Sequence, residues 1–107
     1  ISGGSNVYPR EIEEKMLTLD ALTEVAVLGV PDPKWGEVGV AVCVARPGAS
    51  VTEEEITAFL KDKVSGYKVP RKIFFFDEMP KTSYGKITKK LIRETLVERG
   101  LLDGAPA

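Results

Sequence analysis

The sequence predicts an α+β domain in which a small, three-stranded, largely antiparallel sheet is flanked by helices. Segments with a helical apolar period alternate with short valine-rich runs, and glycine and proline residues separate them. The 107 residues fit one domain with a core of its own. Apolar residues make up 43% and charged residues 29%, which is typical of a globular protein, and no apolar run approaches the roughly 20 residues that cross a bilayer. We therefore expect a single soluble domain without a membrane span.

The first 20 residues predict a short glycine-rich loop and then a helix. Gly3 and Gly4 allow tight backbone conformations. Pro9 followed by acidic residues is typical of the first turn of a helix. Ile12 and Met16 lie four residues apart, so one face of this helix should pack on the core.

Two valine-rich runs, residues 25–30 and 38–44, predict a pair of strands. Pro31 and Pro33 interrupt the chain between them, so we expect a long connection. The single cysteine, Cys43, cannot form an internal disulfide, and its apolar neighbours predict a buried, unreactive thiol.

The second half predicts a helix, a strand and a last helix. Thr52 with Glu55 three residues later is typical of a capping box, and the helix should continue to about Val64 and end at Gly66. Residues 72–76 predict the third strand and residues 79–85 a loop. Residues 88–98 predict the last helix, closed by Gly100.

Composition excludes several classes of function. The chain has no histidine, which excludes Ser-His-Asp and Cys-His catalysis and histidine zinc sites, and we expect no metal site. The net charge of -1 argues against a nucleic-acid binder. Residues 68–93 nevertheless carry eight basic and two acidic residues. Two interpretations stay open for this segment, a solvated surface and a surface that meets an anionic ligand.

The sharpest local feature is the segment 80–87, Pro-Lys-Thr-Ser-Tyr-Gly-Lys-Ile. A phosphate-binding P-loop needs glycine where Pro80 stands and Ser or Thr where Ile87 stands, so this is not a P-loop. Gly85 still permits a tight turn beside the cation of Lys86. From these residues alone, Lys86 is either a surface lysine or a contact for phosphate or carboxylate.

Four segments in fixed order carry a family resemblance: residues 3–13, 31–37, 66–70 and 80–87. Together they resemble the C-terminal domain of the adenylate-forming acyl-CoA synthetases, also called acyl-CoA ligases. The resemblance implies that residues 1–107 are the mobile C-terminal domain of such an enzyme. We expect the large N-terminal domain, its partner in the reaction, and the hinge between them to precede Ile1.

The resemblance also implies a two-step reaction and roles for individual residues. ATP, with Mg2+ held mainly by the large domain, would convert a carboxylic acid to acyl-AMP, and CoA would then displace AMP. Lys86 matches the family lysine of the adenylation step, and Asn6 matches a polar residue near the adenylate. Gly3 and Gly4 match the loop that lines the tunnel for the CoA arm.

Further resemblances concern the CoA nucleotide and regulation. Trp35 either lies against the CoA arm or packs on the strand ends, and both interpretations stay open. Tyr67 matches an aromatic residue that stacks on the adenine, and Lys68 and Arg71 could meet the phosphates of CoA. The segment around Lys86 also resembles the sites that lysine acetyltransferases modify, which implies an acetyltransferase and a deacetylase as partners.

Two other functions are kept as alternatives. An adenylation domain of a peptide synthetase would use a carrier-protein thiol in place of CoA, but Lys89-Lys90 stands where that branch carries Asp-Arg. A non-catalytic module could bind a protein or polyanion through residues 68–93. The chain lacks a terminal Ser-Lys-Leu signal, so we expect a cytoplasmic enzyme.

Overall fold

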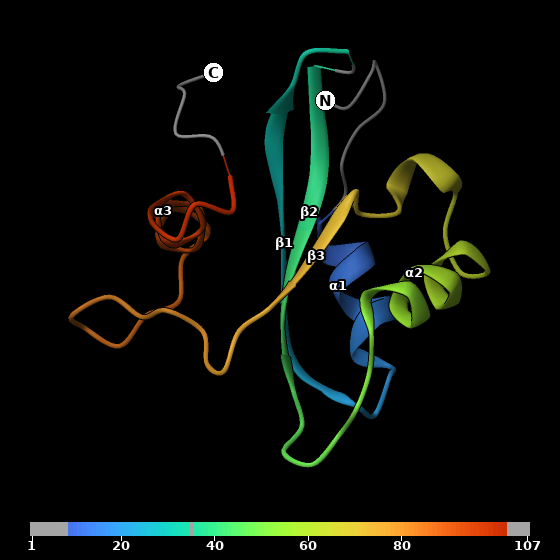
Figure 1. Cartoon of the computed structure of the whole chain (residues 1–107), viewed down its shortest axis with the longest axis horizontal. Helices are drawn as coiled ribbons and strands as arrows, with labels where there is room; N and C mark the ends of the chain where they lie inside the picture. Colours follow the sequence, from blue (N-terminus) through green and yellow to red (C-terminus); the bar gives the residue numbers. More distant parts are fainter. Residues whose placement is uncertain (1–8, 35, 103–107) are drawn as a thin grey trace.

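The α+β class is confirmed by the computed structural model, which describes residues 9–34 and 36–102. Figure 1 shows a central sheet with helices on both of its faces. In chain order the elements are α1 (Pro9–Leu17), β1 (Leu22–Asp32), β2 (Gly36–Ala45), α2 (Glu53–Lys61), the 3-10 helix η1 (Gly66–Lys68), β3 (Lys72–Phe75) and α3 (Lys89–Glu98). The predicted glycine-rich loop falls within residues 1–8, outside the described part of the chain.

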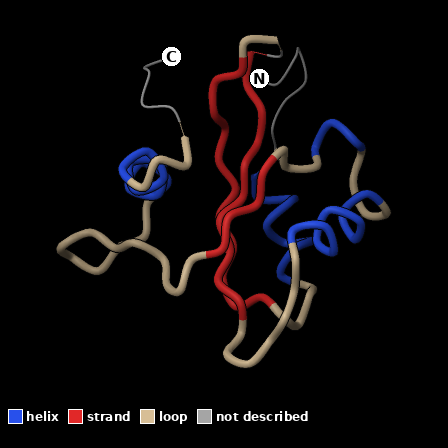
Figure 2. Tube along the Cα trace, in the orientation of Figure 1, coloured by secondary structure: helices blue, strands red, loops and turns tan. Residues whose placement is uncertain are grey.

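The sheet has three strands in the order β1-β2-β3 (Figure 2). β1 and β2 pair antiparallel along their whole length, from Leu22↔Ala45 to Asp32↔Gly36. β3 pairs parallel with β2 over the four positions from Val40↔Lys72 to Cys43↔Phe75. The long pair is therefore antiparallel, as predicted, and the short third strand makes the sheet mixed. The chain passes through α2 before it returns, which gives the length that a parallel crossover needs.

The predicted long connection between the first two strands is wrong. β1 extends past Pro31 to Asp32, with Pro31 paired to Glu37 and Asp32 to Gly36, so Pro33 lies in a short connection between the strands. Pro31 is accommodated because β1 is an edge strand, where a missing N–H does not interrupt an inner ladder. Gly36 has a φ of 80°, which lets the chain enter β2 directly from the turn.

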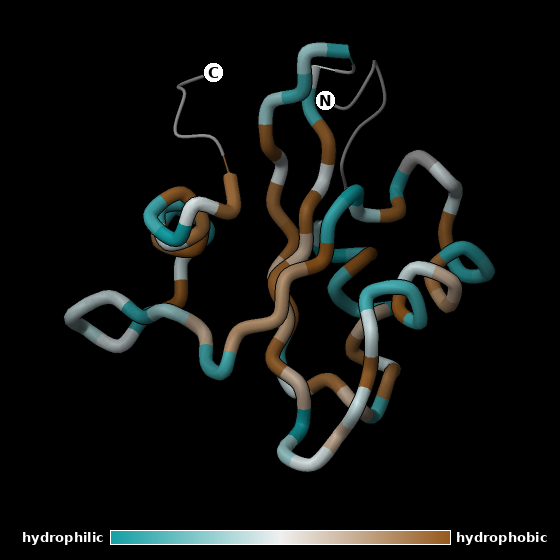
Figure 3. The backbone as a smooth tube through the Cα atoms, in the orientation of Figure 1, coloured by the Kyte–Doolittle hydropathy of each residue, from teal (hydrophilic) through white to brown (hydrophobic). Residues whose placement is uncertain are grey.

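Each face of the sheet has its own apolar cluster, and Figure 3 shows hydrophobic colour concentrated along the strands. Side chains alternate between faces along β1, so Val27 joins one cluster and Leu28 the other. The cluster under α1 and α2 consists of Ile12, Met16, Leu22, Val27, Ala41, Cys43, Ile56, Leu60 and Ile73. The cluster under α3 consists of Ala26, Leu28, Val30, Val40, Val42, Val44, Phe76, Met79, Ile92 and Leu96.

The predicted capping box is confirmed. The N–H of Glu55 donates to Oγ1 of Thr52 at 3.1 Å, and the N–H of Thr52 donates to Oε1 of Glu55 at 2.9 Å. α2 ends at Lys61, before the predicted end near Val64, and Gly66 begins η1 instead of ending the helix. The difference arises because one-turn 3-10 structure has no apolar period of its own to read from the sequence.

α3 ends at the predicted Glu98 and begins at Lys89, one residue later than predicted, because Thr88 is its N-cap. Oγ1 of Thr88 accepts from the N–H of Leu91 at 3.1 Å, which satisfies one free donor of the first turn. Gly100 has a φ of 74°, and the N–H of Leu101 donates to the carbonyl of Leu96 at 2.9 Å. No helix within residues 9–34 and 36–102 is long and apolar enough to cross a membrane.

Both edges of the sheet are capped by helix carboxylates. Oε2 of Glu13 in α1 accepts from the N–H of Val27 in β1 at 2.7 Å. Oε2 of Glu53 in α2 accepts from the N–H of Ile73 in β3 at 2.9 Å. Edge strands expose donors that can pair with other chains, and these contacts occupy one donor on each edge.

Candidate functional site

Lys86 lies in a turn between β3 and α3 that Thr82 closes from both sides. The N–H of Thr82 donates to the carbonyl of Lys86 at 2.7 Å, and the N–H of Lys86 donates to Oγ1 of Thr82 at 3.1 Å. The N–H groups of Gly85 and Tyr84 donate to the carbonyl and to Oγ1 of Thr82 at 2.8 and 3.3 Å. Residues 82–86, called the lysine turn below, therefore form a small closed ring.

The glycine before the lysine is required by the backbone. Gly85 has a φ of 80°, a conformation that side chains rarely adopt, although a Cβ there would meet no atom within 4 Å. The turn therefore needs glycine for its dihedral angle and not for space. Lys86 itself is exposed, so the turn holds a positive charge at the surface on a fixed backbone. Such a cation can meet a phosphate or a carboxylate of a second molecule or domain.

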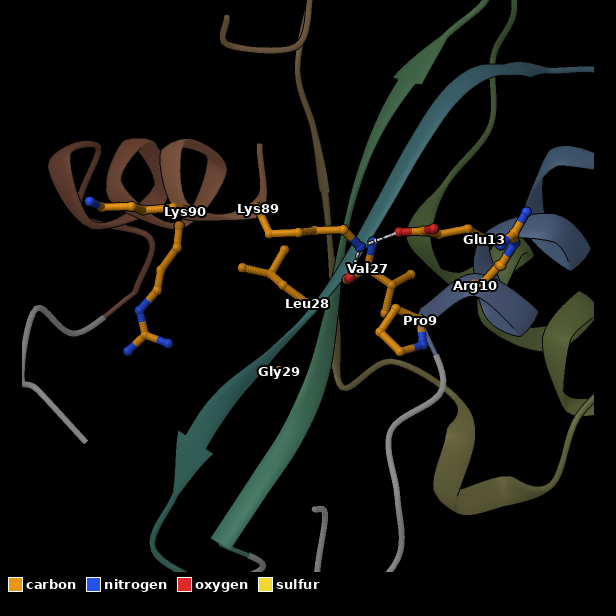
Figure 4. Close-up of a pocket in the computed structure, with 9 residues that line it drawn as sticks. Pro9, Arg10, Glu13, Val27, Leu28, Gly29, Lys89 and Lys90 are labelled. Atoms are coloured by element: carbon orange, nitrogen blue, oxygen red, sulfur yellow. Dashed lines mark hydrogen bonds and ion pairs between the residues drawn. The ribbon is translucent and has the colours of Figure 1, made fainter. Parts of the chain in front are cut away.

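An open groove of about 690 Å³ lies between α1, β1 and the start of α3 (Figure 4). Lys89 reaches from α3 across the groove, and its Nζ contacts both Oε2 of Glu13 and the carbonyl of Val27. Figure 4 shows Lys90, the next residue, pointing away from Glu13. The two adjacent lysines thus differ in use, because Lys89 fastens α3 to the sheet edge and Lys90 faces outward.

Lys68 and Arg71, predicted to contact CoA, lie at the other end of β3. Nζ of Lys68 pairs with Oε1 of Glu11 at 2.9 Å, and the Lys68 side chain is only 17% exposed. Arg71 is exposed, and its N–H donates to the carbonyl of Gly39 at 2.8 Å. In Figure 1 the helix η1, which carries Lys68, and the lysine turn lie on opposite sides of the sheet. The structure therefore separates the predicted adenylation residue from the predicted nucleotide residues.

The other predicted site residues are not described. Gly3, Gly4, Asn6 and Trp35 lie outside the described residues, as does the side chain of Tyr67. Their roles stay predictions. Over residues 9–34 and 36–102, no group of three or more His, Cys, Asp or Glu residues could hold a metal ion.

The burial of Cys43 makes its thiol unreactive. Its side chain is fully buried, and desolvation raises the pKa of the thiol to about 12. A thiol that stays protonated at neutral pH is a poor nucleophile, so Cys43 has a packing role, as the sequence predicted.

Sequence reasoning missed Thr82 and the contact between Glu13 and Lys89. A threonine three residues before a glycine is a common turn pattern, so Thr82 could have been anticipated. The second contact joins residues 76 positions apart, and no local pattern indicates it.

Comparison with known proteins identifies the family. Residues 11–86 match the AMP-binding enzyme C-terminal domain. The chain belongs to this family. As an AMP-binding enzyme C-terminal domain it is 45% identical over 93 residues to feruloyl-CoA synthase of Amycolatopsis sp, covering 87% of the chain and 19% of that protein. It is 43% identical over 94 residues to the long-chain-fatty-acid–CoA ligase FadD13 of Mycobacterium tuberculosis, covering 88% of the chain and 18% of that protein.

Solved structures agree with this assignment. Apo MatB from Rhodopseudomonas palustris matches with a TM-score of 0.83 at 38% identity, over 90% of the chain and 19% of that structure. A Mycobacterium tuberculosis fatty acyl CoA synthetase matches with a TM-score of 0.82 at 40% identity, over 92% of the chain and 20% of that structure. The chain thus spans about a fifth of the length of the proteins that it matches.

Proposed function

We propose that these residues form the mobile C-terminal domain of an ATP-dependent acyl-CoA ligase. The observation that carries the proposal is an exposed Lys86 on a closed turn, in a chain of the AMP-binding enzyme C-terminal family. Relatives named as a feruloyl-CoA synthase and a long-chain-fatty-acid–CoA ligase support this class of reaction. The large N-terminal domain would supply the acyl pocket and most of the ATP site. The proposal includes a cytoplasmic location, where ATP and CoA are available.

In the first step a carboxylate oxygen of the acid attacks the α-phosphorus of ATP, and pyrophosphate leaves. Negative charge builds on the phosphoryl oxygens as the new bond forms. A positive charge already held in place stabilises that transition state without reorganisation, which is the role we assign to Lys86. Asn6 would contact the adenylate. In this proposal Mg2+ accompanies ATP and is held mainly by the large domain.

In the second step the domain rotates, the thiol of CoA attacks the acyl carbonyl, and AMP leaves. Gly3, Gly4 and Trp35 would line the passage for the CoA arm, and Tyr67 would stack on its adenine. Of the two cations near η1, Arg71 is the better candidate for a CoA phosphate, because it is exposed while Lys68 already pairs with Glu11. Separation of these residues from Lys86 supports the use of different surfaces in the two steps (Figure 1).

Exposure of Lys86 also supports regulation by acetylation. An exposed lysine on a surface turn is accessible to a lysine acetyltransferase, and acetylation would remove the charge that the first step uses. A deacetylase would restore it. Full activity of an enzyme whose Lys86 is completely acetylated, as determined by mass spectrometry, would rule this regulation out.

The decisive experiment measures the two half-reactions separately in the full-length enzyme. Lys86→Ala should lower acyl-adenylate formation by about 10² to 10³ fold, the usual effect of losing one preorganised charge contact. Thioester formation from supplied acyl-AMP and CoA should stay near that of the wild type. The control is Lys81→Ala, because Lys81 is another exposed lysine one residue before the turn. Equal losses in both half-reactions would contradict the proposed role of Lys86.

The full-length enzyme also allows a test of which thiol accepts the acyl group. A CoA ligase transfers the acyl group to free CoA, whereas a peptide-synthetase adenylation domain requires a carrier-protein thiol. Transfer to the carrier protein together with no transfer to CoA would replace the proposal with that alternative.

A further inference from the structure

Tyr84 has the most exposed large hydrophobic side chain in the described part of the chain. It is 90% exposed, whereas Leu17, Phe75, Ile87 and Leu101 are between 41% and 46% exposed. Single exposed apolar residues are ordinary on protein surfaces. Tyr84 differs because it belongs to the lysine turn, two residues before Lys86.

The turn fixes Tyr84 and Lys86 to each other. Thr82 accepts hydrogen bonds from the N–H groups of both residues, at 3.3 and 3.1 Å, and donates its own N–H to the carbonyl of Lys86. Their Cα atoms lie within about 7.6 Å of each other, because only two trans peptide units separate them. A surface that surrounds Lys86 during the reaction therefore comes within reach of the Tyr84 side chain.

The proposed function defines that surface. Lys86 acts in a site built by the large domain, so the turn must press against that domain in the first step. An aromatic ring that leaves water contributes strongly to an interface, and its hydroxyl can keep a polar partner. Residues 79–90 contain four lysines and no acidic residue. The complementary surface is therefore an apolar recess with an acidic rim or with the phosphates of ATP beside it.

We propose that Tyr84 is a positioning residue whose ring docks in a recess of the large domain and seats the lysine turn for adenylation. The inference rests on the proposed function and deepens it. Tyr84 contacts no reacting atom in this proposal. In the second step the domain has rotated and the ring has left the recess, so Tyr84 should affect the first step alone.

The test uses the full-length enzyme and three variants. Tyr84→Ala should lower acyl-adenylate formation by about 10 to 100 fold, the usual effect of losing the burial of one aromatic ring, here the burial gained on docking. Tyr84→Phe keeps the ring and should stay within about threefold of the wild type. Ser83→Ala changes the neighbouring exposed residue of the same turn and should also stay within about threefold. Thioester formation from acyl-AMP and the melting temperature should not change in any variant.

Several results would overturn the proposal. Adenylation by Tyr84→Ala within about threefold of the wild type, with Lys86→Ala strongly impaired, would remove the docking role and leave the proposed function standing. A loss in Tyr84→Phe as large as that in Tyr84→Ala would assign the effect to the hydroxyl and refute ring docking. Equal losses of Tyr84→Ala in both half-reactions would indicate a general structural role. If Lys86→Ala spares adenylation, the proposed function and this inference both fail.

Discussion

Replacement of Glu13 by alanine tests whether one carboxylate holds three elements of the fold together. Oε2 of Glu13 accepts the N–H of Val27 at 2.7 Å and pairs with Nζ of Lys89, so it links α1, β1 and α3. The Glu13 side chain is 20% exposed and that of Lys89 is 49% exposed. The carboxylate of Glu13 is therefore better shielded from water than the carboxylate of a typical surface ion pair.

The expected loss follows from these contacts. A hydrogen bond to a charged group contributes about 1.5 to 3 kcal/mol, and a half-exposed ion pair adds about 0.5 to 1 kcal/mol. Glu13→Ala should therefore lower the free energy of unfolding by about 2 to 4 kcal/mol. For a domain of this size, a loss of about 3 kcal/mol lowers the melting temperature by roughly 15 °C.

Thermal and urea unfolding of the 107-residue chain measure this loss. Glu14→Ala is the matched control, because Glu14 is the next residue in the same helix, is 69% exposed and pairs with Arg10 at 3.6 Å. That change should cost less than about 0.5 kcal/mol. Glu13→Gln keeps an acceptor for the N–H of Val27 and loses the charge. Its loss in the free energy of unfolding should therefore lie between those of Glu13→Ala and Glu14→Ala. If Glu13→Ala is no less stable than Glu14→Ala, the reasoning about the link is refuted.

Three further predictions concern the site and the core. Gly4→Leu in the full-length enzyme should block thioester formation and spare adenylation, because a side chain there would fill the proposed CoA passage, and the separate half-reaction assays check this. Thr82→Val removes the oxygen that accepts from Tyr84 and Lys86, so adenylation should fall about tenfold while Thr82→Ser retains activity; equal rates would contradict this. Burial raises the pKa of Cys43 from 9.0 to about 12, so the folded chain keeps a proton that the unfolded chain loses above pH 9. Its contribution to stability is complete below pH 9 and falls by about 1.4 kcal/mol per pH unit between pH 9 and 12. Urea unfolding of Cys43→Ala at pH 8 and 10 should lack this component, and an unchanged difference between the two pH values would refute it.

Local patterns predicted the elements well because their causes are local. The capping box of Thr52 and Glu55 and the closing Gly100 depend on residues within one turn. The connection after Pro31 was mispredicted because a proline is a breaker in an inner strand and is tolerated at an edge, and strand order is a property of the whole sheet. The parallel pairing of β3 with β2 was also missed, because strand direction in a sheet depends on the path of the whole chain.

In the candidate site too, residues in local motifs were predictable and contacts between distant residues were not. Lys86 could be named from the segment 80–87, and Arg71 from its place directly after the segment 66–70, because both segments are contiguous in the sequence. The pairing of Lys68 with Glu11 and of Lys89 with Glu13 depends on helix packing that brings distant residues together. Sequence alone therefore marks cations as candidates and cannot say which of them already have partners.

The contact of Lys89 with Glu13 and Val27 has a mechanical consequence for the lysine turn. Only Ile87 and Thr88 separate Lys86 from Lys89, which is anchored to α1 and to the sheet edge. The turn therefore has almost no free length of chain on its C-terminal side. In the proposed cycle, a rotation of the domain would carry α1, the sheet edge and Lys86 together, because Glu13 and Lys89 link α1 and β1 to the start of α3. Lys86 should move as part of a rigid body, so each rotation would deliver it to the active site without a separate step of loop ordering.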